Sequence, residues 1–536
     1  MRLTAGEYLC KVLEHWGTDV VFGIPGVHTI ELYRGLGSTG IRHITPRHEQ
    51  AAGFMADGYA RATGKPGVAF VISGPGVTNI STAMGQAYGD SIPMLVISAV
   101  NAQGRMDSGQ GWLHEMPDQR GLSAHVSAFS QTIRHPDQIL PALTRAFGVF
   151  TSARPRPVHL ELPIDVMAMD ASDLPLPPLP ALAAPLPPVD VREQAAALLA
   201  GAARPVILVG GGMRGDVAPL ARALDAPVVM STNARGLMAV DDPLAVPLSP
   251  SVGSVRQMIA RADVVLAMGS ELGPTDFDMY EDGGFAIEGA FLRVDIDPAQ
   301  IACGPAPALA LLGDATATAG ALLAALPPAP GMRDGAARAA QARGGRNGLE
   351  PFMRDALAML EALRDALPEA LFVGDSTQLV YAGNLGFTPA RPRAWWNSAT
   401  GFGTLGYGLP AAIGAALGAP GRPVLALVGD GGLQFSLAEL ASATEAGAPL
   451  ILLLHDNSGY GEIKSAMTAA QVAPLGVDLF TPDLESIARA CGWRVERPET
   501  PERLLRACAE AQGMPVPLMI RFGDDMIRAF AERRAG

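Results

Sequence analysis

The sequence predicts an α/β protein of three domains, each a mostly parallel sheet flanked by helices. Three observations predict this fold. The 536 residues correspond to about three domains of roughly 150 residues each. Short apolar runs bounded by glycine or proline alternate with longer helical patterns, which is typical of parallel sheets. A proline-rich segment at 171–190 and an exposed-looking polar segment at 327–350 fit neither pattern and divide the chain as linkers.

The domains are therefore expected at residues 1–170, 191–326 and 351–536. In the first domain, Thr4 and Glu7 form a T-x-x-E capping box that begins a helix. Its further elements are strands near 20–22, 41–45, 68–72 and 94–97 and helices near 49–63 and 77–87. The second domain opens with a strand at 205–209, and the third has strands near 371–373, 424–428, 450–454 and 516–520.

Composition and charge exclude several classes of protein. Lys and Arg number 40 against 53 Asp and Glu, a net charge of −13, so a basic nucleic-acid binder is excluded. The first residues interleave charges with apolar side chains, unlike a signal peptide, and no uncharged apolar run approaches the ~18 residues of a membrane helix. The four cysteines are far apart, which argues against a disulfide framework. We expect a cytoplasmic protein without nucleic-acid or membrane partners.

Two strands of the third domain are each followed by polar residues. The strand at 424–428 runs into GDGG (429–432), and the strand at 450–454 is followed by DNSG (456–459). Ligands of open α/β sheets bind at the carboxyl ends of strands, so Asp430 and Asn457 should emerge side by side. One carboxylate, one amide oxygen and a turn carbonyl suit Mg²⁺ with a phosphate completing its shell. Two ordinary turns are the alternative interpretation.

Two segments of the first domain carry further candidate residues. Glu49 stands at a junction between a strand and a helix, where a carboxylate could bind a ligand or simply complement the helix N-terminus. Ser73 and Asn79 belong to SGPGVTN (73–79), a turn that brings the backbone close to the sheet edge. Both segments precede helices of the same expected domain.

Together these segments resemble the thiamine diphosphate-dependent family of acetolactate synthases and 2-oxo acid decarboxylases. The resemblance runs through all three domains in order. It implies a pyrimidine-binding N-terminal domain, a Rossmann-like middle domain and a diphosphate-binding C-terminal domain. The matching segments are VFGIPG (21–26), RHEQAAGFMADGYARATGKPGV (47–68), SGPGVTN (73–79), AYGDSIPMLVIS (87–98), GTLGYGLPAAIGA (403–415), GDGG (429–432) and DNSGY (456–460).

The resemblance assigns roles to individual residues. It implies that Glu49 hydrogen-bonds the aminopyrimidine ring of the cofactor and so promotes deprotonation of the thiazolium carbon. Asp430, Asn457 and the Gly459 carbonyl resemble the Mg²⁺ ligands that anchor the diphosphate. Leu405 matches the apolar residue that holds the cofactor bent. The remaining cofactor-binding residues that the resemblance implies are Pro25, Gly26, Ser73, Asn79, Ser376, Thr377, Gln378, the Gly403 carbonyl, Gly429, Gly431, Gly432, Tyr460 and Gly461.

In this family the glutamate and the diphosphate site come from different subunits. The resemblance therefore implies a homodimer or homotetramer with active sites at the subunit interface.

The middle domain carries a glycine pattern that requires a choice of ligand. Gly210, Gly212 and Gly215 fit G-x-G-x-x-G after a strand, which is the dinucleotide fingerprint. The acidic residue that NAD needs at the end of the next strand is missing, since residues 231–233 are STN. Acetolactate synthases bind FAD here with an R-F-D-D-R-type segment, but residues 269–274 read GSELGP. The sequence thus argues against both NAD and FAD.

Residues near the expected substrate indicate a cationic side chain. Glu462 replaces the methionine of acetolactate synthases, and its charge would suit a guanidinium group and repel pyruvate. An exposed helix glutamate is the alternative. His114 lies roughly where pyruvate decarboxylases have a histidine pair for proton transfer, and a purely structural histidine is its alternative.

With these features the chain most resembles the 5-guanidino-2-oxopentanoate decarboxylases of arginine catabolism. The expected reaction is loss of CO₂ from this 2-oxo acid to give 4-guanidinobutanal. An acetolactate synthase-type carboligase acting on pyruvate stays open as an alternative. A homologue that has lost catalysis and serves nucleotide binding or regulation is an alternative of another class.

Overall fold

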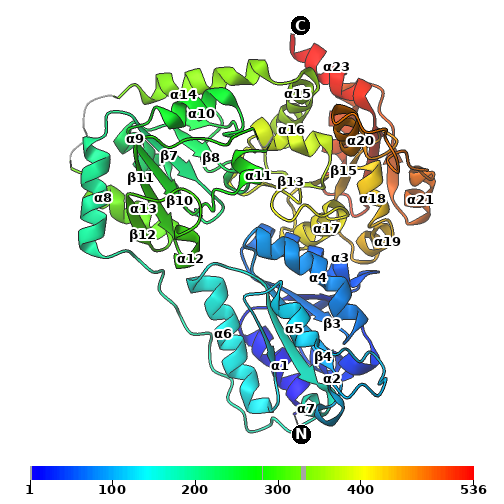
Figure 1. Ribbon diagram of the computed structural model, residues 1–536. Coiled ribbons are helices and arrows are strands. Elements are labelled where there is room, and N and C mark those ends of the chain that lie inside the picture. Colours follow the sequence, from blue (N-terminus) through cyan, green and yellow to red (C-terminus); the bar gives the residue numbers. More distant parts are fainter. Residues whose placement is uncertain (1–2, 280–281, 328–332, 536) are drawn as a thin grey trace.

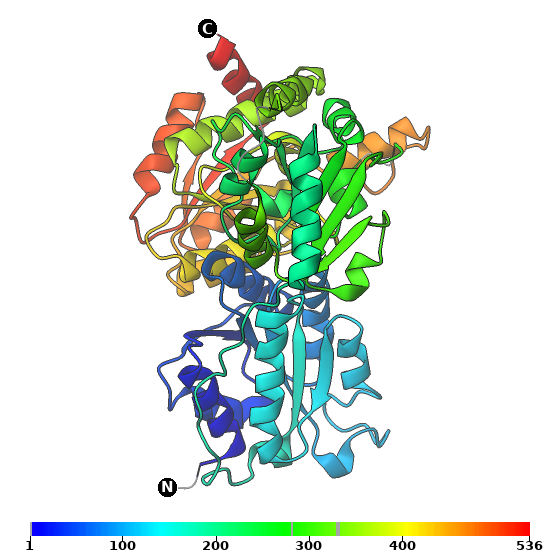
Figure 2. The same ribbon diagram turned by 90° about the vertical axis from the view of Figure 1, so that its left-hand side faces the viewer.

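The computed structural model describes residues 3–279, 282–327 and 333–535. It confirms the predicted fold class, because the chain forms three six-stranded parallel sheets flanked by helices. Figure 1 shows the N-terminal domain below, with the middle and C-terminal domains beside each other above it, and Figure 2 gives the view at right angles. No helix within the described ranges combines the length and apolar character needed to cross a membrane.

The N-terminal domain has the strand order β2-β1-β3-β4-β6-β5. The capping box forms as predicted, with Thr4 Oγ1 accepting from the Glu7 N–H at 3.3 Å and the Glu7 carboxylate accepting from the Thr4 N–H at 2.8 Å. The strands are β1 (Val20–Gly23), β2 (Arg42–Ile44), β3 (Gly67–Val71), β4 (Met94–Val100), β5 (Phe129–Thr132) and β6 (Val158–Pro163). The helices are α1 (Ala5–His15), α2 (Ile30–Leu36), α3 (Glu49–Thr63), α4 (Pro75–Gly89), α5 (Gln119–Ala124), α6 (Ile139–Ser152) and α7 (Ile164–Met167).

The middle domain has the order β12-β11-β10-β7-β8-β9, which is the doubly wound Rossmann order. Its strands are β7 (Pro205–Val209), β8 (Val228–Met230), β9 (Ala245–Val246), β10 (Val264–Met268), β11 (Ala290–Asp295) and β12 (Leu309–Leu312). Its helices are α8 (Val189–Gly201), α9 (Ala218–Leu224), α10 (Gly253–Ala260), α11 (Pro274–Phe277), α12 (Pro298–Ile301) and α13 (Ala315–Ala325), and α14 (Gly335–Arg343) leads out of the domain.

The C-terminal domain has the order β14-β13-β15-β16-β18-β17, which repeats the arrangement of the N-terminal sheet. Its strands are β13 (Leu371–Gly374), β14 (Trp395–Asn397), β15 (Val424–Gly429), β16 (Ile451–His455), β17 (Arg494–Glu496) and β18 (Leu518–Phe522). Its helices are α15 (Pro351–Ala366), α16 (Gln378–Gly386), α17 (Gly408–Gly418), α18 (Asp430–Gln434), α19 (Glu439–Glu445), α20 (Gly461–Ala469), α21 (Leu484–Ala490), α22 (Pro501–Ala511) and α23 (Asp524–Ala535).

The two expected linkers differ in structure. The proline-rich segment follows the surface without helix or strand up to residue 188, after which α8 begins, and it is held through its carbonyls, for example by the Tyr8 hydroxyl on Pro175 O at 2.6 Å. Of the second segment, residues 328–332 lie outside the described residues. Beyond them α14 packs against α10, and its Ala339 and Ala342 are buried. This part is a packed helix rather than the exposed chain we expected, because alanine and arginine favour helix strongly.

The N-terminal and C-terminal domains of one chain share a core. Helices α3 and α17 cross at glycines: a Cβ on Gly58 would lie 1.9 Å from the Ala411 carbonyl oxygen, and one on Gly414 would lie 1.9 Å from that of Met55. The absent side chains let the two backbones touch, so apolar residues of both domains form one continuous cluster. Figure 1 shows α3 and α4 directly below α17.

Candidate active site

The residues expected to bind Mg²⁺ lie together at the ends of two paired strands. Strands β15 and β16 are in parallel register, with Gly429 opposite His455, so Asp430 and Asn457 leave the same sheet edge. Asp430 is fully buried, and its carboxylate accepts from Thr481 Oγ1 at 3.1 Å and from the Asn457 N–H at 3.4 Å. Burial, and next the charge of Asp456, raise the pKa of Asp430.

The donor set of this cluster fits a hard cation. The Asn457 side-chain amide approaches Asp430 Oδ1 and the Gly459 carbonyl oxygen, and with its nitrogen on that side it donates to both, at 3.2 and 2.9 Å. With its oxygen on that side, three oxygens converge and the nitrogen donates to Gln378 Oε1 at 3.3 Å. Rotating the amide would relieve the oxygen contacts, and so would Mg²⁺, which prefers oxygen ligands. Among the described residues no group of three or more His, Cys, Asp or Glu is placed to hold a metal ion.

The glycines around this cluster allow close approach. A Cβ on Gly431 would lie 2.8 Å from the Tyr460 ring, and one on Gly461 would lie 2.7 Å from the Asn457 amide. Thr377 contacts Gly429, where a Cβ would lie 3.1 Å from its hydroxyl. At each of these positions the glycine backbone packs against a neighbouring side chain, and a side chain on the glycine would crowd that contact. The residues predicted around a diphosphate are brought together in this way.

A residue that sequence reasoning missed holds the neighbouring loop. Asp375 follows β13 and is fully buried, and its carboxylate accepts from the N–H groups of Ser376, Gly406 and Gly408 at 2.9, 3.2 and 2.9 Å. Burial raises its pKa to about 6. These bonds tie the segment that contains Leu405 to the sheet edge. The signal was present, because Gly374 and Asp375 follow a strand as Gly429 and Asp430 do.

Glu49 occupies the first turn of α3 and has a defined partner. Asn79, near the start of α4, donates from Nδ2 to Glu49 Oε2 at 2.9 Å. This hydrogen bond joins the segment that contains Glu49 (47–68) to the SGPGVTN segment (73–79). Pro25 and Gly26 lie in the turn after β1, where a Cβ on Gly26 would lie 2.2 Å from the Ile72 side chain.

His114 is paired with a second histidine. The rings of His28 and His114 meet edge to face with centroids 5.4 Å apart. His28 Nδ1 shares a hydrogen bond of 2.8 Å with the buried hydroxyl of Ser73, and burial, and next His114, lower the pKa of His28. His114 Nδ1 is buried without a hydrogen-bond partner in the described parts of the chain. Sequence reasoning missed His28, although it stands in the turn that contains Pro25.

Glu462 lies in the first turn of α20 with its side chain exposed. Its charge acts on Tyr381, which is on α16 one turn beyond Gln378: burial, and next the charge of Glu462, raise the pKa of Tyr381 to about 12. Glu462 directly follows Gly461, whose backbone packs against the Asn457 amide, so this negative charge lies at the edge of the Asn457 cluster.

Within one chain these residues form two separate groups. The Glu49 pair lies near the start of α4, whereas Thr404 bonds Gln86 seven residues further along that helix, about 10 Å away. No hydrogen bond of the described residues joins the Glu49 pair to the Asp430 cluster.

The glycines of the middle domain line a different cavity. Gly210 and Gly212 follow β7 and border a space of about 550 Å³ between the three domains. Asn233 and Arg393 also border it, whereas Glu49, Asp430 and Asn457 do not.

Comparison with known proteins agrees with this arrangement. Residues 3–122 match the N-terminal TPP binding domain of the thiamine pyrophosphate enzymes, residues 192–322 their central domain, and residues 374–522 their C-terminal TPP binding domain. TPP is thiamine pyrophosphate, another name of thiamine diphosphate.

Curated relatives match over nearly the whole length. A protein of Pseudomonas aeruginosa named probable 2-ketoarginine decarboxylase AruI is 46% identical over 512 residues, covering 94% of this chain and 91% of that protein. The acetolactate synthase large subunit of Corynebacterium glutamicum is 30% identical over 560 residues, or 98% and 87% of the two chains. The large subunit of acetolactate synthase isozyme 1 of Escherichia coli is 32% identical over 472 residues, or 86% and 83%. The chain thus belongs to the thiamine pyrophosphate enzyme family and has its three domains in order.

Proposed function

We propose that this protein is a TPP- and Mg²⁺-dependent decarboxylase that converts 2-ketoarginine, which is 5-guanidino-2-oxopentanoate, to 4-guanidinobutanal and CO₂. The observation that carries the proposal is the 46% identity, over 94% of this chain, to the relative named for that reaction. The more distant acetolactate synthases share the domains but would be expected to act on pyruvate, without a cation to bind.

The C-terminal domain would hold the cofactor. Asp430, Asn457 and the Gly459 carbonyl are the proposed Mg²⁺ ligands, supported by the close approach of the Asn457 amide to Asp430 Oδ1 and to the Gly459 carbonyl. Bound TPP supplies the nucleophilic carbon and takes up the electrons released when CO₂ leaves. The GSELGP segment at 269–274, which differs from the FAD segment of acetolactate synthases, argues against FAD as a further cofactor.

Residues of the N-terminal domain would take part in the proton transfers of the reaction. Glu49 would bind the pyrimidine ring of TPP through its carboxylate, which Asn79 orients by binding Oε2. His114 would deliver a proton to the product carbon, because its Nδ1 has no other partner and His28 packs against its ring. The lowered pKa of His28 favours the neutral form of that ring beside His114.

The protein would recognise the substrate side chain by its positive charge. We assign the guanidinium to Glu462, with the Tyr381 ring beside it. Pyruvate lacks any group that could offset the negative charge of Glu462. This arrangement favours a decarboxylase of a cationic keto acid over a pyruvate carboligase.

The assembly would be a homodimer or a homotetramer. In such an assembly a second chain would bring its Glu49 to the first chain's Asp430 cluster. We place the protein in the cytoplasm, in arginine catabolism after transamination, and its four free thiols are consistent with a reducing compartment.

The test is CO₂ release by the purified protein with TPP and Mg²⁺, comparing 2-ketoarginine with pyruvate and identifying the products. Preference for 2-ketoarginine with an aldehyde product supports the proposal. Preference for pyruvate with acetolactate formed would make the protein a carboligase. Absence of any turnover would favour a regulatory homologue.

Glu462→Gln tests the substrate side chain separately. We expect kcat/KM for 2-ketoarginine to fall about tenfold or more, since a charge-assisted pair is lost, while 2-oxohexanoate, which has no guanidinium, changes by less than about twofold. Glu502→Gln, in the first turn of α22, is the matched control. An equal loss on both substrates would remove Glu462 from the specificity site.

A further inference from the structure

The loop that carries Gly403 and Leu405 needs support from outside its own backbone. This cofactor loop, defined as residues 398–406, joins β14 to α17. Its glycines Gly401, Gly403 and Gly406 have φ values of +62°, +75° and +78°, a region that favours glycine. Such a loop has no regular pattern of backbone hydrogen bonds, so its conformation depends on partners elsewhere.

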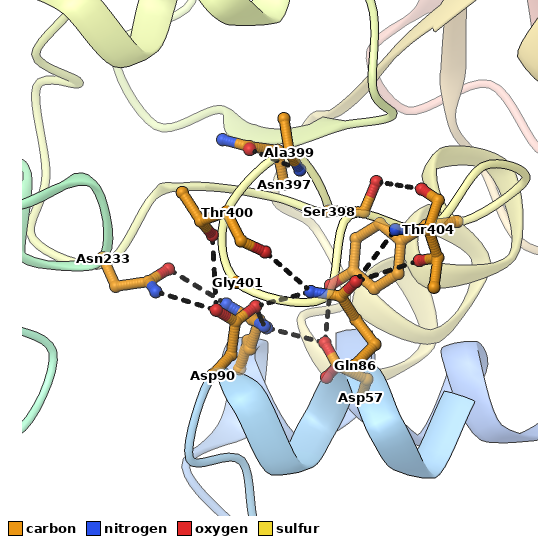
Figure 3. Close-up of polar contacts among 12 residues, drawn as sticks. Asp57, Gln86, Asp90, Asn233, Asn397, Ser398, Ala399, Thr400, Gly401 and Thr404 are labelled. Carbon is orange, nitrogen blue, oxygen red and sulfur yellow. Dashed lines mark hydrogen bonds and ion pairs between the residues drawn. The ribbon is translucent and has the colours of Figure 1, made fainter. Parts of the chain in front are cut away.

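Gln86 on α4 supplies bonds to both halves of the loop. Its side chain is fully buried, and Oε1 accepts from the Thr404 N–H at 3.3 Å and from Thr404 Oγ1 at 3.0 Å. Its Nε2 donates to the Thr400 carbonyl at 3.4 Å. Figure 3 shows the amide of Gln86 reaching from the helix into the loop between these residues.

Gln86 is itself fixed by a charged network. Nε2 also donates to Asp90 Oδ2 at 3.0 Å, and the same carboxylate pairs with Arg61 at 2.5 Å. Asp90 Oδ1 accepts from Thr400 Oγ1 at 3.3 Å and from Asn233 of the middle domain at 3.4 Å (Figure 3). All three domains therefore contribute to the position of one amide group.

The bond to the Thr404 N–H determines where a neighbouring carbonyl points. The Gly403 C=O and the Thr404 N–H belong to one planar trans peptide, so they point in opposite directions. Gln86 binds the N–H side, and Ser398 Oγ holds the Thr404 carbonyl at 2.6 Å. With the plane fixed, the Gly403 carbonyl faces away from Gln86.

We propose that Gln86 is a positioning residue for TPP: it fixes the Gly403–Thr404 peptide plane so that the Gly403 carbonyl can accept a hydrogen bond from the cofactor amine. The inference rests on the proposed function only in that TPP binds at this loop. Gln86 lies in the N-terminal domain and is fully buried. It therefore acts on the cofactor only indirectly, through the cofactor loop of its own chain.

The experiment measures TPP affinity of the full-length protein by calorimetry with Mg²⁺ and no substrate. For Gln86→Met we expect the Kd of TPP to rise about tenfold, since both acceptor bonds to Thr404 are lost. Thr404→Val should raise it about threefold, and Thr404→Ser, which keeps the hydroxyl, should bind like the unaltered protein. The double variant that combines Gln86→Met with Thr404→Val should bind TPP no worse than Gln86→Met alone, because both changes break the same contact.

Stability of the cofactor-free protein separates positioning from folding. Thr144→Val is the matched control, because the Thr144 hydroxyl bonds only the Leu140 carbonyl of its own helix. If Thr404→Val and Thr404→Ser bind TPP equally, or if Gln86→Met lowers only the unfolding temperature, the proposal is wrong. If Gln86→Met does not fold, the two Thr404 variants decide. Failure of the decarboxylase assay would leave these affinities unaffected, so the two hypotheses fail separately.

Discussion

Acid should destabilise the N-terminal domain through one buried histidine. His159 on β6 is fully buried between two hydroxyls, with Nε2 2.8 Å from Ser98 Oγ and Nδ1 2.7 Å from Ser130 Oγ. Burial lowers its pKa from the ordinary 6.5 to about 3. Below pH 6.5 the His159 ring is protonated in the unfolded chain, whereas in the folded chain it stays neutral down to about pH 3. The contribution of His159 to the free energy of unfolding should therefore fall by about 1.4 kcal/mol per pH unit in this window, to a total of about 5 kcal/mol.

The assay compares the unaltered protein with His159→Gln, which keeps one donor and one acceptor, in urea unfolding between pH 7.5 and 4.5. Glu161 lies in the same buried region, and burial raises its pKa, so its titration acts in the opposite direction. The difference between the two proteins isolates His159. We expect the variant to be less stable at pH 7.5 and the difference to shrink by about 2 kcal/mol between pH 6.5 and 4.5. Parallel pH profiles would refute the reasoning.

Further predictions concern the domain junction and the cofactor site. Gly58→Ala should lower the free energy of unfolding by about 1–3 kcal/mol or more, because the new methyl meets the Ala411 carbonyl. Gly320→Ala in α13 is the control and should be neutral or stabilising, because the space around it is open. Equal unfolding temperatures of the two variants would contradict the close helix contact. Glu49→Gln should reduce turnover about 100-fold or more with little change in TPP affinity, and unchanged turnover would remove Glu49 from the mechanism. Chelating Mg²⁺ should weaken TPP binding, and Asp430→Asn should make binding insensitive to the chelator; a variant that still responds to Mg²⁺ would exclude Asp430 as a ligand.

Much of the molecule follows from local sequence pattern. The helix expected at 49–63 has those bounds in the structure, because a strand end and a helix-forming run of alanines define it. Asp430 and Asn457 meet because each follows a buried strand, and strand order is predictable where strands are consecutive. The proximity of Asp430 and Asn457 could therefore be predicted from their spacing.

Other residues depend on contacts that spacing does not encode. Two partners of Asp375, Gly406 and Gly408, lie about 30 residues further along the chain, and the loop partners of Gln86 lie more than 300 residues away. His28 was missed because its partner His114 follows several strands later. These contacts arise only after the sheets and domains have packed, so they required the structure.

The contact between α3 and α17 has a consequence for biosynthesis. The helices are separated by roughly 350 residues of sequence, so the apolar surface of α3 emerges from the ribosome long before α17 exists to cover it. At typical elongation rates this interval lasts about 20–70 s. The N-terminal domain must therefore remain soluble, alone or on a chaperone, with an uncovered apolar surface until synthesis is nearly complete. Its marginal stability in that interval, rather than the stability of the finished protein, would limit the yield of folded chains.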